Sequence, residues 1–282
     1  MLPTLAALAL LAGQSAPAEK AVKPVVGVVP APCSALPVVP ASVVDFTVRA
    51  IKAKAAHLAA PVRTAEEKAV YRRWQDALLL ADFPGLCRYR AENATLPPPG
   101  PDRIVFFGDS ITEFWRREDR AFFEGDRIDR GIAGQTTSQM VARFRADVIA
   151  LRPKVVHIMA GTNDIAGNTG PTSLAAIENN LATMSELARA HGIRVVLASV
   201  PPAAGFDWRP EINPVEDIRA LNRWIAEYAR RENLSFIDYY SALEDPRHAF
   251  RRELTDDGVH PNKAGYAVMR AILEKELRKS RG

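Results

Sequence analysis

The stretch Ile104-Val-Phe-Phe-Gly-Asp-Ser-Ile-Thr112 decides the fold class of this chain. Its first four residues are apolar and run directly into Gly108-Asp-Ser110, and the residues that follow are compatible with a helix. A short apolar run that ends in a glycine and a helix start is typical of a strand buried on both faces of a parallel sheet. Such a turn places one hydroxyl at the end of the sheet, so Ser110 is either a nucleophile or the cap of the next helix.

The same alternation of apolar and amphipathic segments continues to the end of the chain. The candidate strands are 104–107, 128–130, 155–160, 194–200 and 235–238, and the last helix is expected from about 262 to 277. Strands that alternate with helices predict an α/β fold, in which helices cover both faces of a five-stranded parallel sheet. Ligands of such sheets bind at the carboxyl ends of the strands, so the residues just after each strand are the candidates for a site.

The first residues of the chain have the composition of an export signal. Residues 1–18 carry no charged side chain, contain an apolar run and end in Ala16-Pro-Ala18, which predicts a signal peptide. A membrane anchor, one alternative, needs about 18 apolar residues where roughly 10 are present. A disordered terminus is the other alternative. Gln14 stands where a lipoprotein needs a cysteine, so we expect no lipid anchor and no stable membrane insertion.

Two segments separate this signal from the predicted sheet. Residues 19–44 are rich in Pro, Ala and Val and are predicted to form an extended tether. Residues 45–100 are predicted to form a helical N-terminal extension, with one helix from Phe46 and a second opened by the capping box Thr64-Ala-Glu-Glu67. The prolines of Leu96-Pro-Pro-Pro-Gly100 end this extension, so the main domain is expected to span 101–282.

Composition excludes several classes of partner. The chain of 282 residues has 37 basic and 33 acidic side chains, a net charge of only +4, and no basic cluster interleaved with aromatic residues, so nucleic acid is not an expected partner.

The two cysteines, Cys33 and Cys87, fit either one disulfide or two free thiols. Neither has a neighbouring ligand at metal spacing, so no metal or other cofactor is expected. The oligomeric state is not indicated.

The loops after the second and third strands carry groups that could bind an anion. Gly134 can bring a bare backbone N–H close to a ligand, and Thr136 or Thr137 can cap the helix that follows. Asn163 offers uncharged N–H donors that can stabilise a developing oxyanion. Each motif alone is also consistent with an ordinary turn.

The loop before the last helix carries Asp257-Gly-Val-His260, with Pro261 expected as the first residue of that helix. Asp257 can hold the imidazole of His260 from the side opposite a nucleophile. A serine is a poor nucleophile until a base accepts its proton, and histidine suits this task near neutral pH. The predicted catalytic residues are therefore Ser110, Asp257 and His260. The backbone N–H groups of Ser110 and Gly134 and the side chain of Asn163 form the predicted oxyanion hole.

These motifs, in this order, resemble the four signature blocks of the SGNH, or GDSL, hydrolase superfamily. The matching residues are Gly108-Asp-Ser110, Gly134, Gly161-Thr-Asn-Asp164 and Asp257-Gly-Val-His260. The resemblance covers about 101–277 and implies a three-layer α/β/α flavodoxin-like fold and a metal-independent serine esterase. Thr112 stands where the G-x-S-x-G elbow has its second glycine, which argues against the ordinary α/β-hydrolase family.

The function predicted from the sequence is that of an exported serine esterase, periplasmic or secreted, which removes short acyl groups, mainly acetyl, from small-molecule or glycan esters. A lysophospholipase or thioesterase, an O-acyltransferase with the same triad and a non-catalytic glycan-binding module remain alternatives. Trp208 and Arg209, after the fourth strand, are candidates for substrate contact, although a structural role for Trp208 is equally open. His157, inside the third strand, is expected to be a core residue.

Overall fold

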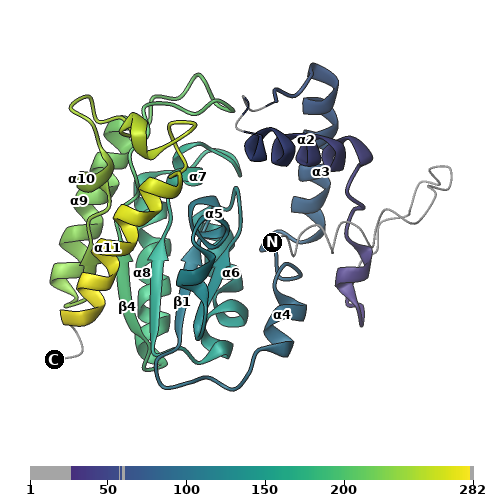
Figure 1. The fold of residues 1–282 in the computed structure, drawn as a ribbon. Coiled ribbons are helices and arrows are strands. Elements are labelled where there is room, and N and C mark those ends of the chain that lie inside the picture. The colour runs from purple at the N-terminus through teal and green to yellow at the C-terminus, as the bar shows by residue number, and fades with distance from the viewer. Residues whose placement is uncertain (1–26, 57, 59–60, 280–282) are drawn as a thin grey trace. The chain divides into compact units, whose positions relative to one another are not determined.

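The computed structural model describes residues 27–56, 58 and 61–279. The predicted signal peptide and the first part of the predicted tether, residues 19–26, lie outside the described residues. The chain divides into two compact units between Phe83 and Pro84. All the predicted site residues belong to the second unit, whose sheet and helices are drawn in Figure 1.

The second unit is built on one sheet of five parallel strands in the order β2-β1-β3-β4-β5. The strands are β1 (Ile104–Gly108), β2 (Arg127–Gly131), β3 (Val155–Met159), β4 (Arg194–Ala198) and β5 (Ser235–Ile237). The five predicted strands are confirmed, with ends that differ by at most two residues from the predicted ones. The order 2-1-3-4-5 is that of flavodoxin-like folds, so the predicted fold class is confirmed as well.

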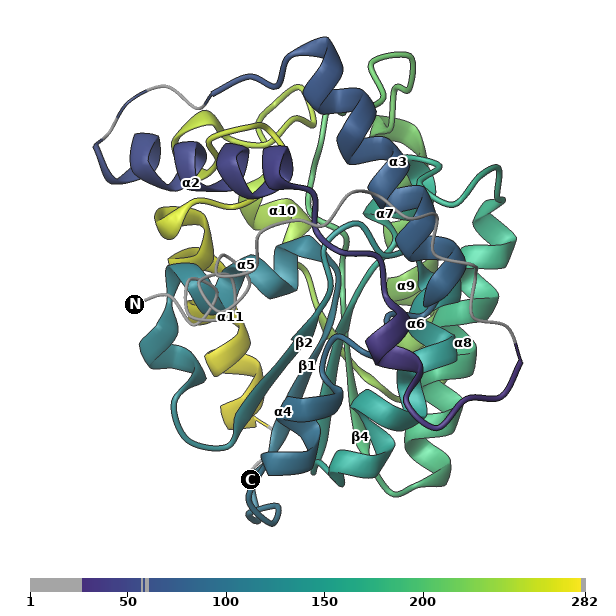
Figure 2. The same cartoon turned by 90° about the vertical axis from the view of Figure 1, so that its right-hand side faces the viewer.

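Helices cover both faces of this sheet, as Figure 2 shows. On one face lie α5 (Ser110–Glu118) and α11 (Lys263–Lys279), and on the other lie α6 (Thr137–Asp147), α8 (Leu174–Ala190) and α9 (Val215–Arg231). The short elements are α4 (Arg90–Thr95), α7 (Thr162–Ile165), α10 (Tyr240–Leu243), η2 (Arg120–Phe123), η3 (Ile149–Leu151) and η4 (Arg252–Leu254). None of the helices among the described residues combines the length and apolar character needed to cross a membrane.

Side chains of β1 alternate between two apolar cores, one on each face of the sheet. Val105 and Phe107 belong to the core under α6, α8 and α9, whereas Ile104 and Phe106 belong to the core under α5 and α11. Burial of each such side chain stabilises the fold by about 1.5–3 kcal/mol. A strand buried on both faces needs an unbroken apolar run, which explains why β1 was recognisable from the sequence.

His157 of β3 lies in the second of these cores, as predicted. It is fully buried, and its Nε2 lies 3.1 Å from the hydroxyl of Tyr239. Burial lowers the pKa of His157 to about 3, so its imidazole is neutral at physiological pH. Its Nδ1 has no hydrogen-bond partner among the described residues, so this core histidine is only half satisfied.

The first unit contains η1 (Pro32–Ala35), α2 (Ala41–Ala55) and α3 (Ala65–Ala81). The capping box at Thr64 is confirmed, because the Thr64 side chain accepts from the backbone N–H of Glu67 and the Glu67 carboxylate accepts from that of Thr64. The first helix starts at Ala41, inside the segment predicted to be an extended tether. No residue of α3 is buried.

The segment 84–100 belongs to the second unit, although the sequence placed the start of the main domain at residue 101. Tyr89 is buried, and its hydroxyl donates to the carbonyl of Gly131 at the end of β2. The fully buried guanidinium of Arg130 donates to Asn93 Oδ1 at 2.8 Å and to Glu92 Oε1 at 2.9 Å. These contacts give a buried charge its partners, so α4 is part of the sheet domain. The prolines at 97–99 mark a turn inside it.

Both cysteines of the chain, Cys33 and Cys87, are disulfide-bonded. The alternative of two free thiols is therefore wrong. A structural disulfide fits a protein that folds in an oxidising compartment.

Candidate active site

Three loops leave the sheet side by side at its carboxyl end. Gly108 of β1 is in register with Gly131 of β2 on one side and with Met159 of β3 on the other. The next residues of these three strands lead to Ser110, Gly134 and Asn163, respectively. The parallel register therefore brings the predicted nucleophile and the predicted oxyanion donors to one edge of the sheet.

The turn between β1 and α5 settles which residue caps the helix. Asp109 is the N-cap, and its Oδ1 accepts from the backbone N–H of Ile111 at 2.9 Å. Ser110 is the first residue of α5, so the interpretation of Ser110 as the helix cap is wrong. Its hydroxyl is left available for another partner, and its residue is only 8% exposed.

That partner is His260. Ser110 Oγ lies 2.9 Å from His260 Nε2, and His260 Nδ1 lies 2.7 Å from Asp257 Oδ2. With Nδ1–H donating to the carboxylate, Nε2 is left as the acceptor for the serine hydroxyl. The structure thus brings together Ser110, His260 and Asp257, which are up to 150 residues apart in the sequence.

Asp257 holds both the imidazole and its own loop. Its second oxygen, Oδ1, accepts from the backbone N–H of Val259 at 3.0 Å and of His260 at 2.8 Å. Desolvation raises the pKa of Asp257, but its hydrogen bond to His260, the charge of that histidine and the backbone donors outweigh it and lower the pKa to about 2. The carboxylate is therefore ionised throughout the physiological pH range.

The backbone on either side of the His260 side chain is held by Thr255 and Asn262. Thr255 Oγ1 donates to the carbonyl of His260 at 2.7 Å. Asn262 Oδ1 accepts from the backbone N–H groups of Ala264 and Gly265, at 2.9 and 3.1 Å, and so caps α11. The expectation that Pro261 is the first residue of this helix is wrong, because the cap is Asn262 and α11 begins at Lys263.

Asn163, the predicted oxyanion donor of β3's loop, is held at both ends of its amide. Its Nδ2 donates to Asp109 Oδ2 at 3.1 Å, and its Oδ1 accepts from Asn168 Nδ2 at 2.8 Å. Asn163 is 3% exposed, so each of these groups needs a partner. One N–H of Asn163 has no protein acceptor among these bonds and is available for an oxyanion.

Gly134 lies in the loop after β2 and adopts φ +81°, which is in the left-handed region that favours glycine. Its carbonyl accepts from Asn168 Nδ2 at 3.1 Å, which joins this loop to that of Asn163. A Cβ at Gly134 would have no atom closer than 3.9 Å. The need for glycine here is therefore a matter of backbone conformation rather than space.

Two buried carboxylates, those of Asp109 and Asp164, lie next to these predicted donors. Burial raises the pKa of Asp109 to about 6, against the opposing effects of the Ile111 N–H and the charge of His260. Burial likewise raises the pKa of Asp164 to about 6, although Thr137 donates to it through its hydroxyl at 2.6 Å and its backbone N–H at 2.9 Å. Asp164 thus connects the start of α6 to the loop of Asn163. Of the two predicted caps of this helix, Thr136 and Thr137, the structure shows Thr136 as the N-cap.

Trp208 and Arg209 lie on the loop after β4, and both contact the loop of α7. Trp208 Nε1 donates to Asn168 Oδ1 at 3.0 Å, while its ring packs against Phe206 and stays 42% exposed. Arg209 Nε donates to the carbonyl of Ala166 at 3.2 Å. Both residues therefore have structural contacts, and contact with a substrate stays a prediction.

Two residues at the site were not identified from the sequence. The ring of Phe114 lies 5.0 Å from that of His260, centroid to centroid. Phe114 follows Ser110 by four residues in α5, so helical spacing could have revealed it. Asn168 is the second, and nothing in its local sequence distinguishes it from a turn residue.

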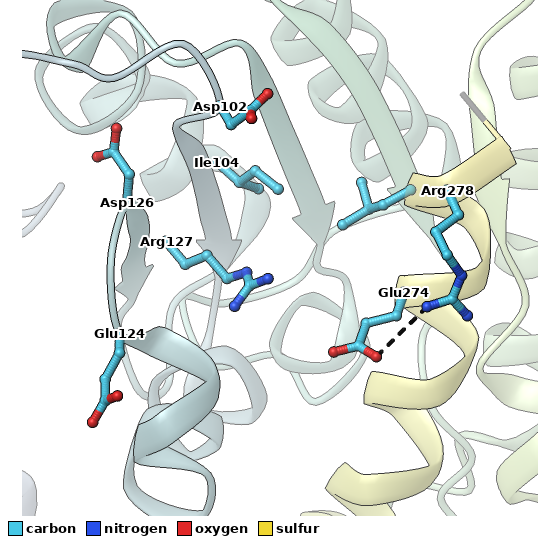
Figure 3. A pocket seen from close by; sticks show the side chains of 8 residues that line it. Asp102, Ile104, Glu124, Asp126, Arg127, Glu274 and Arg278 are labelled. Carbon is cyan, nitrogen blue, oxygen red and sulfur yellow. Dashed lines mark ion pairs between the residues drawn. The ribbon is translucent and has the colours of Figure 1, made fainter. Parts of the chain in front are cut away.

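A cavity of about 480 Å³ lies at the opposite end of the sheet (Figure 3). Its lining includes Ile104 and Arg127, the first residues of β1 and β2, together with Glu274 and Arg278 of α11. It shares no residue with the site around Ser110. The described residues also contain no group of three His, Cys, Asp or Glu side chains that could hold a metal ion.

The family is decided by a match over the sheet domain. The model of the GDSL-like lipase/acylhydrolase family matches residues 106–268, which is more than half of the chain. The chain belongs to this family. The predicted membership is confirmed, and the family is one of lipases and acylhydrolases.

A solved GDSL-like lipase from Bacteroides thetaiotaomicron is 43% identical to the chain, with a TM-score of 0.69, and the match covers 70% of this chain and 99% of that one. The uncharacterized lipoprotein YqeF of Bacillus subtilis is 39% identical over 36% of this chain and 50% of its own length. An acetylxylan esterase of Geobacillus stearothermophilus is 25% identical over 53% of this chain and 71% of its own. The chain thus spans half the length of the first of these curated relatives.

Proposed function

We propose that this protein is an exported serine esterase that hydrolyses short-chain acyl esters, above all acetyl esters of carbohydrates. The observation that carries the proposal is the hydrogen-bonded series from Ser110 Oγ through His260 to Asp257. A nucleophile, a base and a group that orients the base, all at hydrogen-bond distance, are the arrangement that acyl transfer through a serine requires.

In the proposed reaction Ser110 Oγ attacks the ester carbonyl while its proton passes to His260 Nε2. The negative charge that forms on the carbonyl oxygen is stabilised by the N–H groups of Ser110, Gly134 and Asn163. The intermediate then collapses: the alcohol leaves with the proton from His260, and the acyl group stays on Ser110. Water, with His260 as its base, attacks this acyl-enzyme and releases the acid. Asp257 keeps the imidazole in the required tautomer and stabilises its protonated form.

Two observations support a carbohydrate ester as the substrate. The acetylxylan esterase relative acts, by its name, on an acetylated glycan. In addition, the half-exposed Trp208 is linked to Asn163 by hydrogen bonds through Asn168. An exposed indole next to a reaction centre suits the apolar face of a sugar ring. Export is supported by the apolar first residues of the chain, by its bonded cysteines and by the lipoprotein relative.

The test is a substrate panel with the purified protein. It compares p-nitrophenyl acetate, butyrate, octanoate and palmitate, then acetylated xylo-oligosaccharides, a lysophospholipid and an acyl-CoA. We expect the highest kcat/KM for the acetyl ester and for the acetylated sugars. A preference for octanoate or longer chains, or for the lysophospholipid, would contradict the substrate proposal. New sugar esters formed when an acceptor sugar is added would instead indicate the acyltransferase.

A further inference from the structure

The carboxamide of Asn168 connects three separate parts of the candidate site. Its Nδ2 donates to Asn163 Oδ1 at 2.8 Å and to the carbonyl of Gly134 at 3.1 Å. Its Oδ1 accepts from Trp208 Nε1 at 3.0 Å. A carboxamide has two N–H donors and one oxygen, so every hydrogen-bonding group of Asn168 has a partner at this site.

Asn168 determines which way the amide of Asn163 faces. With the Asn168 donor on Asn163 Oδ1 and the Asp109 carboxylate on Asn163 Nδ2, both ends of the amide are matched. A flipped Asn163 would set two N–H groups against each other at one end and two oxygens against each other at the other. The flip is thus disfavoured, and one N–H of Asn163 keeps its direction toward an oxyanion.

Asn168 also fixes the carbonyl side of Gly134. This glycine is in the left-handed region, which a glycine enters and leaves without steric cost, so contacts with its neighbours have to hold it there. The preceding residue is held as well, because the backbone N–H of Ala133 donates to Glu113 Oε2 at 2.7 Å. With Ala133 held on one side and the Gly134 carbonyl on the other, the Gly134 N–H has a defined direction.

We propose that Asn168 is a positioning residue that aligns two oxyanion donors, Gly134 and Asn163, and that Trp208 holds Asn168 in place through its indole N–H. The inference rests on the proposed esterase function and adds a role for a residue outside the triad. An oxyanion hole works only when its donors are in place before the charge develops, so a small error in their direction lowers turnover rather than substrate binding.

The test compares three variants at Asn168 and Trp208 with the full-length wild type. Asn168→Ala removes the whole network. Asn168→Asp keeps the shape but sets a carboxylate against two acceptors, Asn163 Oδ1 and the Gly134 carbonyl. Trp208→Phe keeps an aromatic ring next to Phe206 and removes only the N–H donor. We expect kcat for p-nitrophenyl acetate to fall roughly 10- to 100-fold in both Asn168 variants, somewhat less than for outright loss of a donor, with KM within about twofold. In Trp208→Phe we expect kcat to fall less, by roughly two- to fivefold.

The matched control is Asn180→Ala. Asn180 of α8 also carries an amide that donates to another element, at 2.9 Å to Thr137 Oγ1 at the start of α6, and this hydrogen bond does not go to Gly134 or Asn163. We expect its kcat to stay within about twofold of the wild type. The melting temperature of every variant is measured alongside, so that a loss of folded protein is not taken for a loss of turnover.

The outcomes separate this proposal from the one on which it rests. Suppose that the wild type is active and that the Asn168→Asp variant keeps full kcat or changes only in KM. This result overturns the positioning role and leaves the esterase proposal intact. A fall in kcat that is equal in Asn180→Ala overturns it too, because the effect would then be general loosening of the loops. A wild type with no esterase activity on any substrate overturns both proposals.

Discussion

Asp257 illustrates how much a single side chain does at this site. One oxygen holds the imidazole of His260 and the other holds the backbone of the same loop. The pKa of about 2 reflects these contacts, since the ionised form accepts all of them. Because this pKa is lowered relative to the unfolded chain, the stability that the carboxylate contributes is complete above about pH 4 and is lost as the pH falls toward 2.

Replacement of Asp257 by Asn should leave a folded but poorly active protein. An Asn side chain can present an N–H to His260 Nδ1, which favours the tautomer with the proton on Nε2 and leaves Ser110 without its base. We expect kcat/KM for p-nitrophenyl acetate to fall by about 10²- to 10⁴-fold at neutral pH. Steady-state kinetics checks the value. The matched control is Asp256→Asn, since Asp256 is the neighbouring carboxylate and accepts from Asn262 Nδ2 at 3.4 Å, whereas the imidazole is held by Asp257. A loss below threefold would show that Asp257 does not orient the base.

The buried carboxyl group of Asp129 in β2 leads to a separate prediction about how stability depends on pH. It is buried, and burial raises its pKa to about 7, although the N–H of Gly131 donates to it at 2.8 Å. A raised carboxyl pKa means that the folded state binds the proton more tightly than the unfolded chain. The wild type should therefore lose stability as the pH rises from about 4 to 7, by at most about 4 kcal/mol from this group.

The Asp129→Asn variant cannot lose a proton, so it should lack this contribution. We expect its melting temperature, relative to that of the wild type, to rise by several degrees between pH 5 and pH 8. Thermal unfolding at closely spaced pH values measures the difference. A difference that stays constant or falls with pH would mean that Asp129 is ionised without cost in the folded protein.

At this scale the sequence was informative where residue type and spacing are tied to chemistry. Ser110, Asp257 and His260 were predicted as a set because each follows the sheet at a position where acyl transfer needs it. Asn168 could not be found in that way, since its three partners, Gly134, Asn163 and Trp208, come from three different loops. Only the three-dimensional structure brings these partners to one carboxamide.

At the scale of elements, the β1–α5 unit depends on a close approach between α5 and β2. A Cβ built on Gly131 would lie 2.3 Å from the backbone nitrogen of Glu113 and 2.7 Å from the carbonyl oxygen of Asp109. Both atoms belong to the backbone around the start of α5, so neither can move without moving Ser110. The glycine at the end of β2 is thus a condition for the position of Ser110.

Gly131→Ala should therefore lower both stability and activity. We expect about 2–3 kcal/mol of destabilisation, as for other overpacked sites, and at least a tenfold lower kcat. Gly205→Ala is the matched control for stability, because a Cβ there would meet no atom within 4 Å. Chemical unfolding and kinetics of the two variants give the comparison. Equal stability of both variants would contradict the close packing of α5 on β2.

The elements themselves were largely predictable, because β1, β3 and β4 are made mainly of apolar residues and most helices carry a repeat of three to four residues. In β2 only Ile128 is apolar apart from the final glycine, so its sequence signal was weaker. The start of α11 was placed too early, since the rule that prolines begin helices competed with the capping ability of Asn262. The start of α2 at Ala41 was missed because the prolines before it suggested an extended segment.

At the scale of the whole molecule, the division between the two units was not evident from composition. The prolines of 97–99 suggested a boundary, whereas α4 is joined to the sheet through Tyr89, Asn93 and the buried Arg130. Such long-range contacts leave no periodic signal in the sequence. The unit that begins at Pro84 thus contains the sheet, the triad and the partners of Arg130.

Two truncated proteins test this division. The longer one, 84–282, carries Cys87→Ser, and the shorter one, 101–282, does not contain Cys87. The protein 84–282 should unfold cooperatively and keep esterase activity, because the hydrogen bonds of Ser110, His260 and Asp257 and those of Asn168 are formed within it. The protein 101–282 should be markedly less stable or insoluble, because Arg130 and Asp147 lose Asn93 as a partner inside the fold. Circular dichroism and thermal unfolding compare them. Equal stability of the two would place the boundary at residue 100.

The central claim is that Ser110 is the nucleophile of an esterase, and the most direct measurement is covalent labelling combined with turnover. Wild type and Ser110→Ala are each treated with a fluorophosphonate probe, analysed by mass spectrometry, and assayed with p-nitrophenyl acetate. We predict one probe per wild-type molecule, attached to Ser110, no probe on the variant, and a fall in turnover of at least about 10³-fold. Undiminished turnover in Ser110→Ala, or a wild type that is never labelled at Ser110, would contradict the account.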